Sequence, residues 1–313
     1  MKKIQGNIKT LIECPLCGQF EATSKQIRSH IGGFPISIVE CPLCGLVFQH
    51  PQPTQEKGTN YFNWRYKTSN RGKSQVNMYL SDREFCSQIS HARIQWIRSI
   101  TNGHRFLDVG TGNGALIYAA REAGFEATGL DLSQQAIFKA KEMFGIDIRK
   151  ADITDIHADE VYDIITSFGM IEHLRDPFEF LKTAYNHIIP GGTLIIETMN
   201  YNSMLRLLLD KRWYFFLYDH LFYFTPETLK IFLERSGFIN IQIHEVPHSA
   251  NVTLPKHNTK TTGILFKLTH KIKYAVYHPF IALRYPLILK TAKKMWPQDW
   301  KREILLFTAR KAK

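Results

Sequence analysis

Short apolar runs alternate with amphipathic stretches between His104 and Asn200. The apolar runs predict strands over 106–109, 126–130, 146–150, 162–167 and 193–197. The stretches between them predict helices over 115–123, 133–144 and 177–188. Gly124 predicts the end of the first helix, and Ser133 is the expected N-cap of the second. Strands and helices that alternate at this spacing predict a parallel sheet with helices on both faces.

The alternation continues towards the C-terminus. Thr225 and Pro226 predict the N-cap and first residue of a helix over 225–236, and Gly237 ends it. Two further apolar runs predict strands over 238–246 and 304–309. The chain is therefore predicted to have an α/β fold, with a doubly wound sheet of seven strands.

Residues 199–224 carry a dense block of aromatic side chains between the fifth strand and the following helix. We interpret this block as a lid over an acceptor site, where rings stack on a sugar or a flat ring or meet a lipid tail. The alternative is that the rings pack on the sheet. The aromatic residues of the block are Trp213, Tyr214, Phe215, Phe216, Tyr218, Phe222, Tyr223 and Phe224.

Residues 247–303 form a long basic insertion before the last strand. From Leu254 onward the chain carries 14 Lys and Arg against two acidic residues, so this end accounts for the whole net charge of +12. The pattern predicts either a solvated basic face or peripheral contact of residues 255–302 with an anionic membrane. Because the rest of the chain has no net charge, a nucleic-acid partner is disfavoured.

The start of the chain has no signal peptide, and no apolar run approaches the length of a spanning helix. We therefore expect a cytoplasmic protein with reduced thiols, at most peripheral to a membrane.

Four of the five cysteines lie in two identical pentapeptides, C-P-L-C-G, at 14–18 and 41–45. In a C-x2-C knuckle both thiolates can point at one metal, and two knuckles complete a tetrahedral zinc site. Four protein ligands leave no open coordination position, so the expected Zn²⁺ is structural. A disulfide is disfavoured in the cytosol. The expected metal ligands are Cys14, Cys17, Cys41 and Cys44.

These patterns divide the chain into three parts. Residues 1–53 are expected to form a zinc-ribbon-like module, residues 54–74 a linker and residues 75–313 the larger α/β domain.

A glycine-rich turn over 110–114 follows the first strand of the α/β domain. Its glycines let the backbone approach a ligand, and its amides face a helix N-terminus that can hold an anionic group. Asp131, at the end of the second strand, can accept hydrogen bonds from ribose hydroxyls. On these residues alone a nicotinamide-dependent dehydrogenase also fits, because G-x-G-x-x-A extends from Gly110 to Ala115.

Five motifs in order resemble the class I S-adenosylmethionine-dependent methyltransferases, of the type 11 and type 23 kind. They occupy 107–114 (LDVGTGNG), 129–133 (GLDLS), 151–153 (ADI), 162–174 (YDII to EHL) and 189–192 (IPGG). The resemblance covers about residues 75–246 and the last strand. It implies a Rossmann-like, mostly parallel sheet whose seventh strand is antiparallel. A dehydrogenase would need a second domain with hydride-transfer residues, which is not evident.

The resemblance implies S-adenosyl-L-methionine as cofactor. The family's cofactor contacts carry over to six positions of this sequence. The methionine end of the cofactor would be held by Asp108, Gly110 and Gly112. The ribose would be held by Asp131, and the adenine by Asp152 and Ile153.

Methyl transfer from a sulfonium requires alignment of the acceptor and, where necessary, removal of its proton. The candidate bases are Glu172 and His173, which follow the fourth strand, and His220 in the tripeptide 219–221. Asp219 is adjacent to His220 in sequence, but neighbouring side chains need not face each other, so no dyad is assumed. The alternative for each histidine is a surface or structural imidazole.

A C-P-x-C-G ribbon ahead of this core resembles bacterial methyltransferases of sugar and cell-surface polysaccharide biosynthesis. The expected acceptor is therefore a small molecule, such as a sugar or a polysaccharide or glycolipid precursor. Quinone-pathway O-methyltransferases are similar around 172–173, but a metal-binding carboxylate of that group is replaced here by Gly169.

Two other functions stay open. An RNA methyltransferase is disfavoured because 167–170 (SFGM) replaces the N-P-P-Y type of tetrapeptide. A non-catalytic zinc-ribbon interaction protein with a vestigial cofactor fold is disfavoured by the intact Asp108, Asp131 and Asp152.

Overall fold

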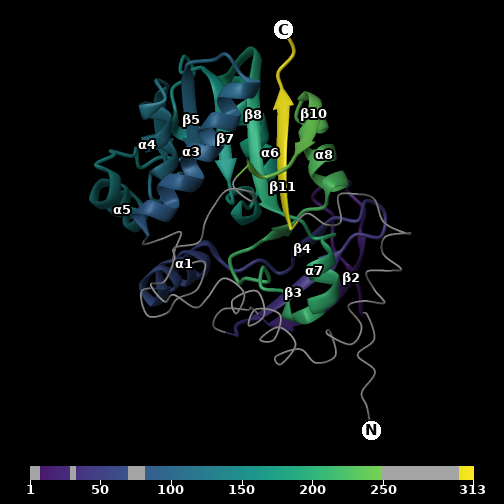
Figure 1. Ribbon diagram of the computed structural model, residues 1–313. Coiled ribbons are helices and arrows are strands. Elements are labelled where there is room, and N and C mark those ends of the chain that lie inside the picture. Colours follow the sequence, from purple (N-terminus) through teal and green to yellow (C-terminus); the bar gives the residue numbers. More distant parts are fainter. Residues whose placement is uncertain (1–7, 29–32, 70–81, 248–302) are drawn as a thin grey trace, which may run out of the picture.

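The structure is a computed structural model that describes residues 8–28, 33–69, 82–247 and 303–313. The described residues form two sheets. The larger sheet belongs to the α/β part in the upper half of Figure 1, and the smaller, antiparallel sheet lies below it. Residues 255–302, for which membrane contact is predicted, lie outside the described residues. Among the described residues, no helix is both long and apolar enough to cross a membrane.

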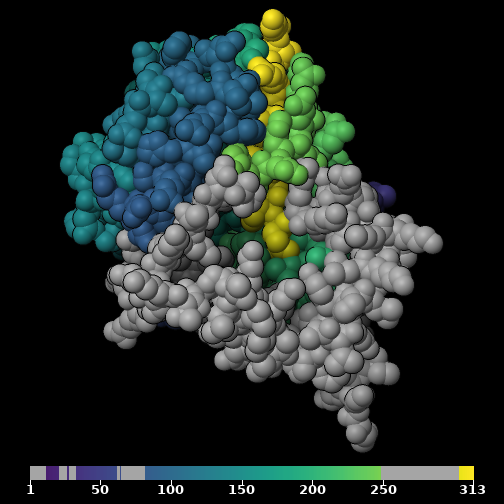
Figure 2. Space-filling view, viewed as in Figure 1, coloured from purple at the N-terminus to yellow at the C-terminus, as the bar shows by residue number. Residues whose placement is uncertain are grey.

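The larger sheet has six strands in the order β10-β11-β8-β7-β5-β6. Strands β5, β6, β7 and β8 pair in parallel, whereas β11 pairs antiparallel with β8 and β10. In Figure 2, β11 (yellow) lies beside β10 (green). The strands are β5 (Arg105–Val109), β6 (Glu126–Leu130), β7 (Tyr162–Phe168), β8 (Ile188–Met199), β10 (Ile239–His244) and β11 (Ile304–Arg310).

Helices cover both faces of this sheet, as predicted. Phe106 of β5 packs in one hydrophobic core with α3 and α4, while its neighbour Leu107 packs in a second core with α6 and α8. Successive side chains of a strand point to opposite faces, so a doubly covered sheet requires apolar residues at every position. The helices are α3 (Arg83–Ile100), α4 (Ala115–Glu122), α5 (Gln134–Phe144), α6 (Pro177–His187) and α8 (Pro226–Arg235).

The expected helix caps are present. The hydroxyl of Ser133 accepts a hydrogen bond from the Ala136 amide at the start of α5. Thr225 and Thr228 form a capping box at the start of α8, with Pro226 in its first turn. Local sequence signals therefore fix where these helices begin.

Two predicted elements differ from the structure. The strand predicted over 146–150 forms only one parallel bridge, between Leu130 and Arg149, so the larger sheet of the described residues has six strands rather than seven. The turn predicted at 190–192 lies inside β8, where the register with β7 shifts and Gly191 has a φ of 79°.

The smaller sheet is antiparallel, in the order β1-β2-β3-β4-β9. Its first four strands are β1 (Ile8–Leu11), β2 (Glu21–Arg28), β3 (Pro35–Glu40) and β4 (Val47–Gln49), and we call residues 8–49 the cysteine-rich module. The fifth strand, β9 (Phe222–Tyr223), comes from the aromatic block of the α/β domain. One sheet therefore joins both parts of the protein.

Helix α1 (Gln55–Ser69) occupies most of the predicted linker, 54–74. Tyr61 of this helix is buried, and its ring lies 5.3 Å from that of Phe34 and 5.4 Å from that of Tyr218. The segment therefore contacts both the cysteine-rich module and the aromatic block.

Most rings of the aromatic block are buried. Trp213, Phe216 and Tyr223 are at most 1% exposed and pack in one cluster with Ile36 and Ile38 of β3. Phe222 and Phe224 are also buried, in the core of the α/β domain. These five rings are core residues, which agrees with the packing alternative for them. A short helix, α7 (Met204–Leu209), precedes them.

Candidate active site and cysteine cluster

The glycine-rich turn connects β5 to α4 at the carboxyl edge of the parallel strands. Gly110, Gly112 and Gly114 all have positive φ, at 76°, 58° and 75°. A Cβ at Gly110 would lie 2.6 Å from Cγ of Met170, whereas one at Gly112 would meet nothing within 4 Å. Only glycine adopts this turn without strain, and its outer side at Gly112 is open to a ligand.

Asp131 is bonded directly to this turn. Its Oδ2 accepts a hydrogen bond from the Gly112 amide at 2.8 Å, and its Oδ1 accepts one from the Ser133 amide at 2.8 Å. Burial raises the pKa of Asp131, and the two amides oppose that shift. The structure thus brings the glycine-rich turn together with Asp131, the residue predicted to bind the ribose.

Asp108 lies in β5, next to the turn, and is 3% exposed. The Thr166 hydroxyl donates a hydrogen bond to its Oδ1 at 2.6 Å. Burial raises the pKa of Asp108 to about 6, although hydrogen bonding to Thr166 lowers it. A buried carboxylate at this depth is suited to a cationic partner.

Asp152 and Ile153 lie on the segment that follows the bridge to β6. The Asp131 amide donates to the Arg149 carbonyl at 3.1 Å, which fixes this segment beside Asp131. Asp152 caps a short 3-10 helix by accepting a hydrogen bond from the Thr154 amide. Ile153 is 1% exposed and packs in the core of the α/β domain.

Glu172, His173 and His220 come together, and we call them the acid–imidazole cluster. Each offers one potential ligand atom, and these atoms lie within 4.8 Å of one another. The two imidazole rings are 4.7 Å apart between centroids, in an edge-to-face arrangement. All three predicted bases are thus neighbours in space. Along the chain they come from distant segments, because Asp219, the residue before His220, follows His173 by 46 positions.

Each side of the cluster has polar partners. The Thr198 hydroxyl donates to Oε2 of Glu172 at 2.8 Å, and burial raises the pKa of this carboxyl. Nδ1 of His173 lies 2.8 Å from the Asp219 carbonyl oxygen and 3.7 Å from its carboxylate Oδ2. Because a carbonyl can only accept, Nδ1 of His173 carries the proton, and in a neutral ring Nε2 is then a proton acceptor.

The cluster lies next to the glycine-rich turn. Met170, which would clash with a side chain at Gly110, precedes Glu172 by two residues after the end of β7. The Leu221 amide donates to the Glu172 carbonyl at 2.7 Å, which joins the two chain segments of the cluster. A carboxylate and two imidazoles can relay a proton or hold a divalent cation.

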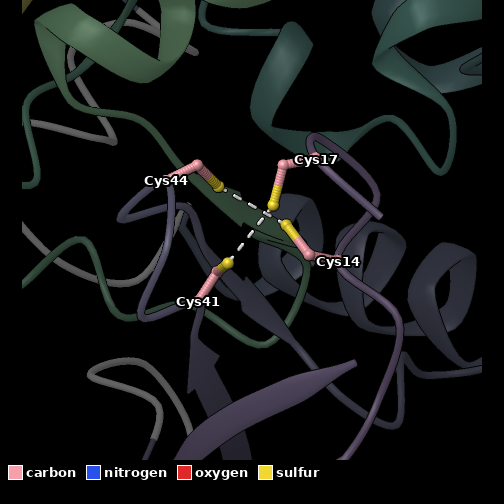
Figure 3. Close-up of side chains that lie close together, drawn as sticks. All are labelled: Cys14, Cys17, Cys41 and Cys44. Atoms are coloured by element: carbon pink, nitrogen blue, oxygen red, sulfur yellow. Dashed lines mark hydrogen bonds between the residues drawn. The ribbon is translucent and has the colours of Figure 1, made fainter. Parts of the chain in front are cut away.

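Figure 3 shows the four cysteines of the two C-P-L-C-G knuckles converging on one point. The Sγ atoms of Cys14 and Cys44 are 3.5 Å apart, and so are those of Cys17 and Cys41. All four thiols are free, and these separations are far longer than a disulfide bond of about 2.05 Å.

This geometry fits a zinc ion. A tetrahedral Zn²⁺ with Zn–S bonds of about 2.3 Å places its sulfurs about 3.8 Å apart, close to the observed spacing. Burial raises the pKa of Cys14 to about 11, so a cation is needed to hold this thiol as a thiolate. The predicted ligand set is therefore assembled in the structure.

Sequence reasoning missed several partners of these sites. Thr166 and Thr198 are strand residues whose hydroxyls bond Asp108 and Glu172. Thr166 lies within the motif over 162–174 but was not itself singled out, and Thr198 lies outside the five motifs. Gln49, which bonds the loop before His220, ends β4. The one available signal was a polar residue in a strand that is otherwise apolar.

Comparison with known proteins identifies the family. A family model described as Methyltransferase domain matches residues 79–243, which is more than half of the chain. The Ubiquinone biosynthesis O-methyltransferase of Aeromonas salmonicida is 27% identical over 190 residues, 54% of this chain and 80% of that protein. The protein of the same name from Bordetella avium is 30% identical over 125 residues, 36% of this chain and 52% of its own length. The chain thus spans about half the length of the latter relative.

A solved structure of a SAM-dependent methyltransferase from Archaeoglobus fulgidus is 21% identical with a TM-score of 0.49, covering 80% of this chain and 99% of that one. The family match confirms the family indicated by the five motifs. The protein belongs to the methyltransferase domain family, which its residues 79–243 match.

Proposed function

We propose that the protein methylates a hydroxyl group of a small-molecule acceptor and that the acid–imidazole cluster removes the acceptor's proton. One observation carries the proposal. Two imidazoles and a buried carboxyl, with ligand atoms within 4.8 Å of one another, lie beside the glycine-rich turn. A hydroxyl is a weak nucleophile until its proton has a nearby acceptor, which histidine supplies near neutral pH.

In this proposal the chain binds the donor through the residues at the carboxyl edge of the sheet. Asp108 would face the methionine ammonium, Asp131 the ribose hydroxyls, and Asp152 with Ile153 the adenine. The open side of Gly112 and its bond to Asp131 support this placement, because they leave space for a ligand beside a fixed carboxylate. When bound, S-adenosylmethionine supplies a methyl group on a sulfonium that needs no further activation.

The acceptor proton would go to an imidazole. Nε2 of His173 takes the proton as the acceptor O–H bond breaks, while the Asp219 carbonyl keeps Nδ1 protonated and the ring oriented. The new O–CH3 bond forms as the C–S bond breaks, and the electron pair of that bond leaves with the sulfur. His220 and Glu172 flank this imidazole and stabilise the charge that develops on it.

The class of acceptor is a hydroxylated ring, either a sugar or a quinol. Both curated relatives named above are O-methyltransferases of ubiquinone biosynthesis, which supports a ring hydroxyl as acceptor. Four aromatic rings contact one another near the loop that carries His220, and they belong to Phe34, Tyr61, Trp64 and Tyr218. Phe34 and Trp64 are each 39% exposed. Partly exposed rings can stack on the face of a sugar or an aromatic acceptor.

We further propose that Cys14, Cys17, Cys41 and Cys44 hold a structural Zn²⁺. The close spacing of the four sulfurs supports this assignment, and four thiolates leave no position for a substrate.

Incubation of the enzyme with labelled S-adenosylmethionine tests the acceptor class. The labelled donor is offered with nucleotide sugars, with catechols and quinols, and with RNA in parallel. Label is expected in one of the first two groups and at an oxygen, shown by its release under ether-cleaving conditions. Label that enters only RNA would contradict the proposal.

A further inference from the structure

We propose that the cysteine-rich module positions the catalytic loop over 217–221 and that Gln49 is its positioning residue. This inference rests on the proposed role of His220 and His173. It assigns to the module a role in the transfer step, beyond holding a metal ion.

The side chain of Gln49 is the main contact. It is 2% exposed, and its amide nitrogen lies 2.8 Å from the His220 carbonyl oxygen, 3.1 Å from that of Tyr218 and 3.3 Å from that of Leu217. Two N–H groups therefore serve three carbonyls of one turn. Buried carbonyls need a donor, so this turn is stable in its observed shape only while an amide occupies that position.

The backbone of β4 adds a second constraint. The Gln49 amide donates to the Leu221 carbonyl at 2.8 Å, and Phe48 pairs with Phe222 in the small sheet. His220 is therefore attached directly to a strand whose other neighbour, β3, leads into the second cysteine knuckle. The metal cluster and the catalytic loop are linked through two adjacent strands.

The chain that leaves β4 also contacts the other half of the cluster. Arg175, two residues after His173, donates hydrogen bonds to the Pro53 carbonyl and to the side chains of Gln52 and Gln55. Residues 49–55 thus contact the His220 side through Gln49 and the His173 side through Arg175. This segment sets the distance between the two imidazoles.

The physical requirement on residue 49 is specific. It must be long enough to reach the turn and must carry a donor, because three carbonyl oxygens lie within hydrogen-bond distance of its side-chain nitrogen. Methionine has a similar length and volume but no donor. Misplacement of a catalytic group by about 1 Å can lower a rate about 100-fold.

The experiment compares Gln49→Met with Gln19→Met in the zinc-loaded protein. Gln19 is a partly buried glutamine of the same module, outside the loop contact. The kcat is measured per cofactor-binding site, as titrated with S-adenosylhomocysteine, so that misfolded molecules are not counted. Gln49→Asn, which keeps the amide on a shorter side chain, is measured in parallel.

We expect Gln49→Met to lower kcat per site about 10- to 100-fold, with an unchanged Kd for S-adenosylhomocysteine. Gln49→Asn should retain more activity than Gln49→Met, and Gln19→Met should match the wild type. An unchanged kcat in Gln49→Met would overturn the inference. A fall in kcat that comes with an equally large rise in the Kd for S-adenosylhomocysteine would also overturn it, since a general loss of packing would then explain the effect.

The histidine variants separate this inference from the proposed function. If His173→Gln and His220→Gln remain active, the proposed function itself fails. If they lose activity while Gln49→Met does not, only the positioning role fails.

Discussion

The side-chain amide of Gln49 donates a hydrogen bond to the backbone carbonyl of His220 at 2.8 Å, across 171 positions of the sequence. The bond joins the cysteine-rich module to the segment that completes the acid–imidazole cluster. Two parts that look separate along the chain therefore form one site. The predictions below test the cofactor side, the metal, the core and the chemistry of this arrangement.

Asp131→Ala should weaken cofactor binding. A charge-assisted hydrogen bond contributes about 1.5–3 kcal/mol, which corresponds to about a 10- to 150-fold higher Kd for S-adenosylmethionine. Calorimetric titration measures the change, with Asp147→Ala as the control because Asp147 is exposed and pairs with Lys141 at the surface. An unchanged Kd in Asp131→Ala would mean that the ribose lies elsewhere.

Cofactor affinity should depend on pH through Asp108. Its pKa is about 6 in the folded protein against the ordinary 3.8 of an aspartate, because burial disfavours the charged form. The contribution of this group to folding stability is thus largest below pH 4 and is lost as the pH rises through 6. The cofactor ammonium has the opposite preference, since it attracts the ionised carboxylate.

Between pH 7 and pH 5, the Kd for S-adenosylmethionine should therefore rise, approaching about tenfold per pH unit below pH 6. Calorimetry in buffers of equal ionic strength measures the slope. Asp108→Asn should bind weakly at every pH with a flat profile over this range. A wild-type Kd that stays constant down to pH 5 would contradict the assignment of Asp108 to the methionine end.

Removal of the metal should affect turnover more than cofactor binding. Chelation is expected to loosen the cysteine-rich module, because its four clustered thiols would lose their shared cation. Through β4 and Gln49 this loosening reaches His220, so kcat per cofactor site should fall while the Kd for S-adenosylhomocysteine changes by less than about twofold.

Metal content by atomic absorption and reconstitution with Zn²⁺ are the controls for that experiment. Recovery of kcat on adding Zn²⁺ supports a structural ion. Loss of cofactor binding on chelation would instead show that the module is part of the cofactor site.

Trp213→Ala should destabilise the protein. Trp213 is fully buried in the cluster between the aromatic block and β3. Truncation of a buried tryptophan costs about 3–5 kcal/mol of the free energy of unfolding. Denaturant titration measures the loss, and Phe138→Ala, at a ring that is 64% exposed, should change it little. Normal stability with lost activity would mean that Trp213 is a lid residue rather than a core residue.

The sequence predicted the elements that local signals determine. Caps such as Ser133 and Thr225, and apolar runs such as 106–109, depend on neighbouring residues and were found where expected. The glycine-rich turn and the cysteine knuckles were recognisable for the same reason. Each is a short pattern whose spacing reflects its own geometry.

Contacts between distant segments were not predictable in this way. Strand β9 is only two residues long and lies in a block dense in aromatic residues. No periodicity of apolar and polar residues therefore marks it as the partner of β4. The strand predicted over 146–150 has the right alternation, with Ile146 and Ile148 buried. It forms a single bridge to β6, in which the Arg149 backbone bonds the Gly129 carbonyl and the Asp131 amide.

The acid–imidazole cluster was predicted as three candidates but not as a geometry. Asp219 is next to His220 in sequence, yet its carbonyl and carboxylate face His173. Side chains of adjacent residues in a turn need not face the same way, so a pairing cannot be derived from their adjacency. Only the fold shows which imidazole Asp219 orients.

The most direct test of the account measures turnover and cofactor affinity together in His173→Gln and His220→Gln, using the acceptor found with labelled donor. We expect kcat to fall about 100- to 10,000-fold for the proton acceptor, while the Kd for S-adenosylmethionine stays unchanged. If both variants transfer methyl at the wild-type rate, the chemistry does not take place at this cluster.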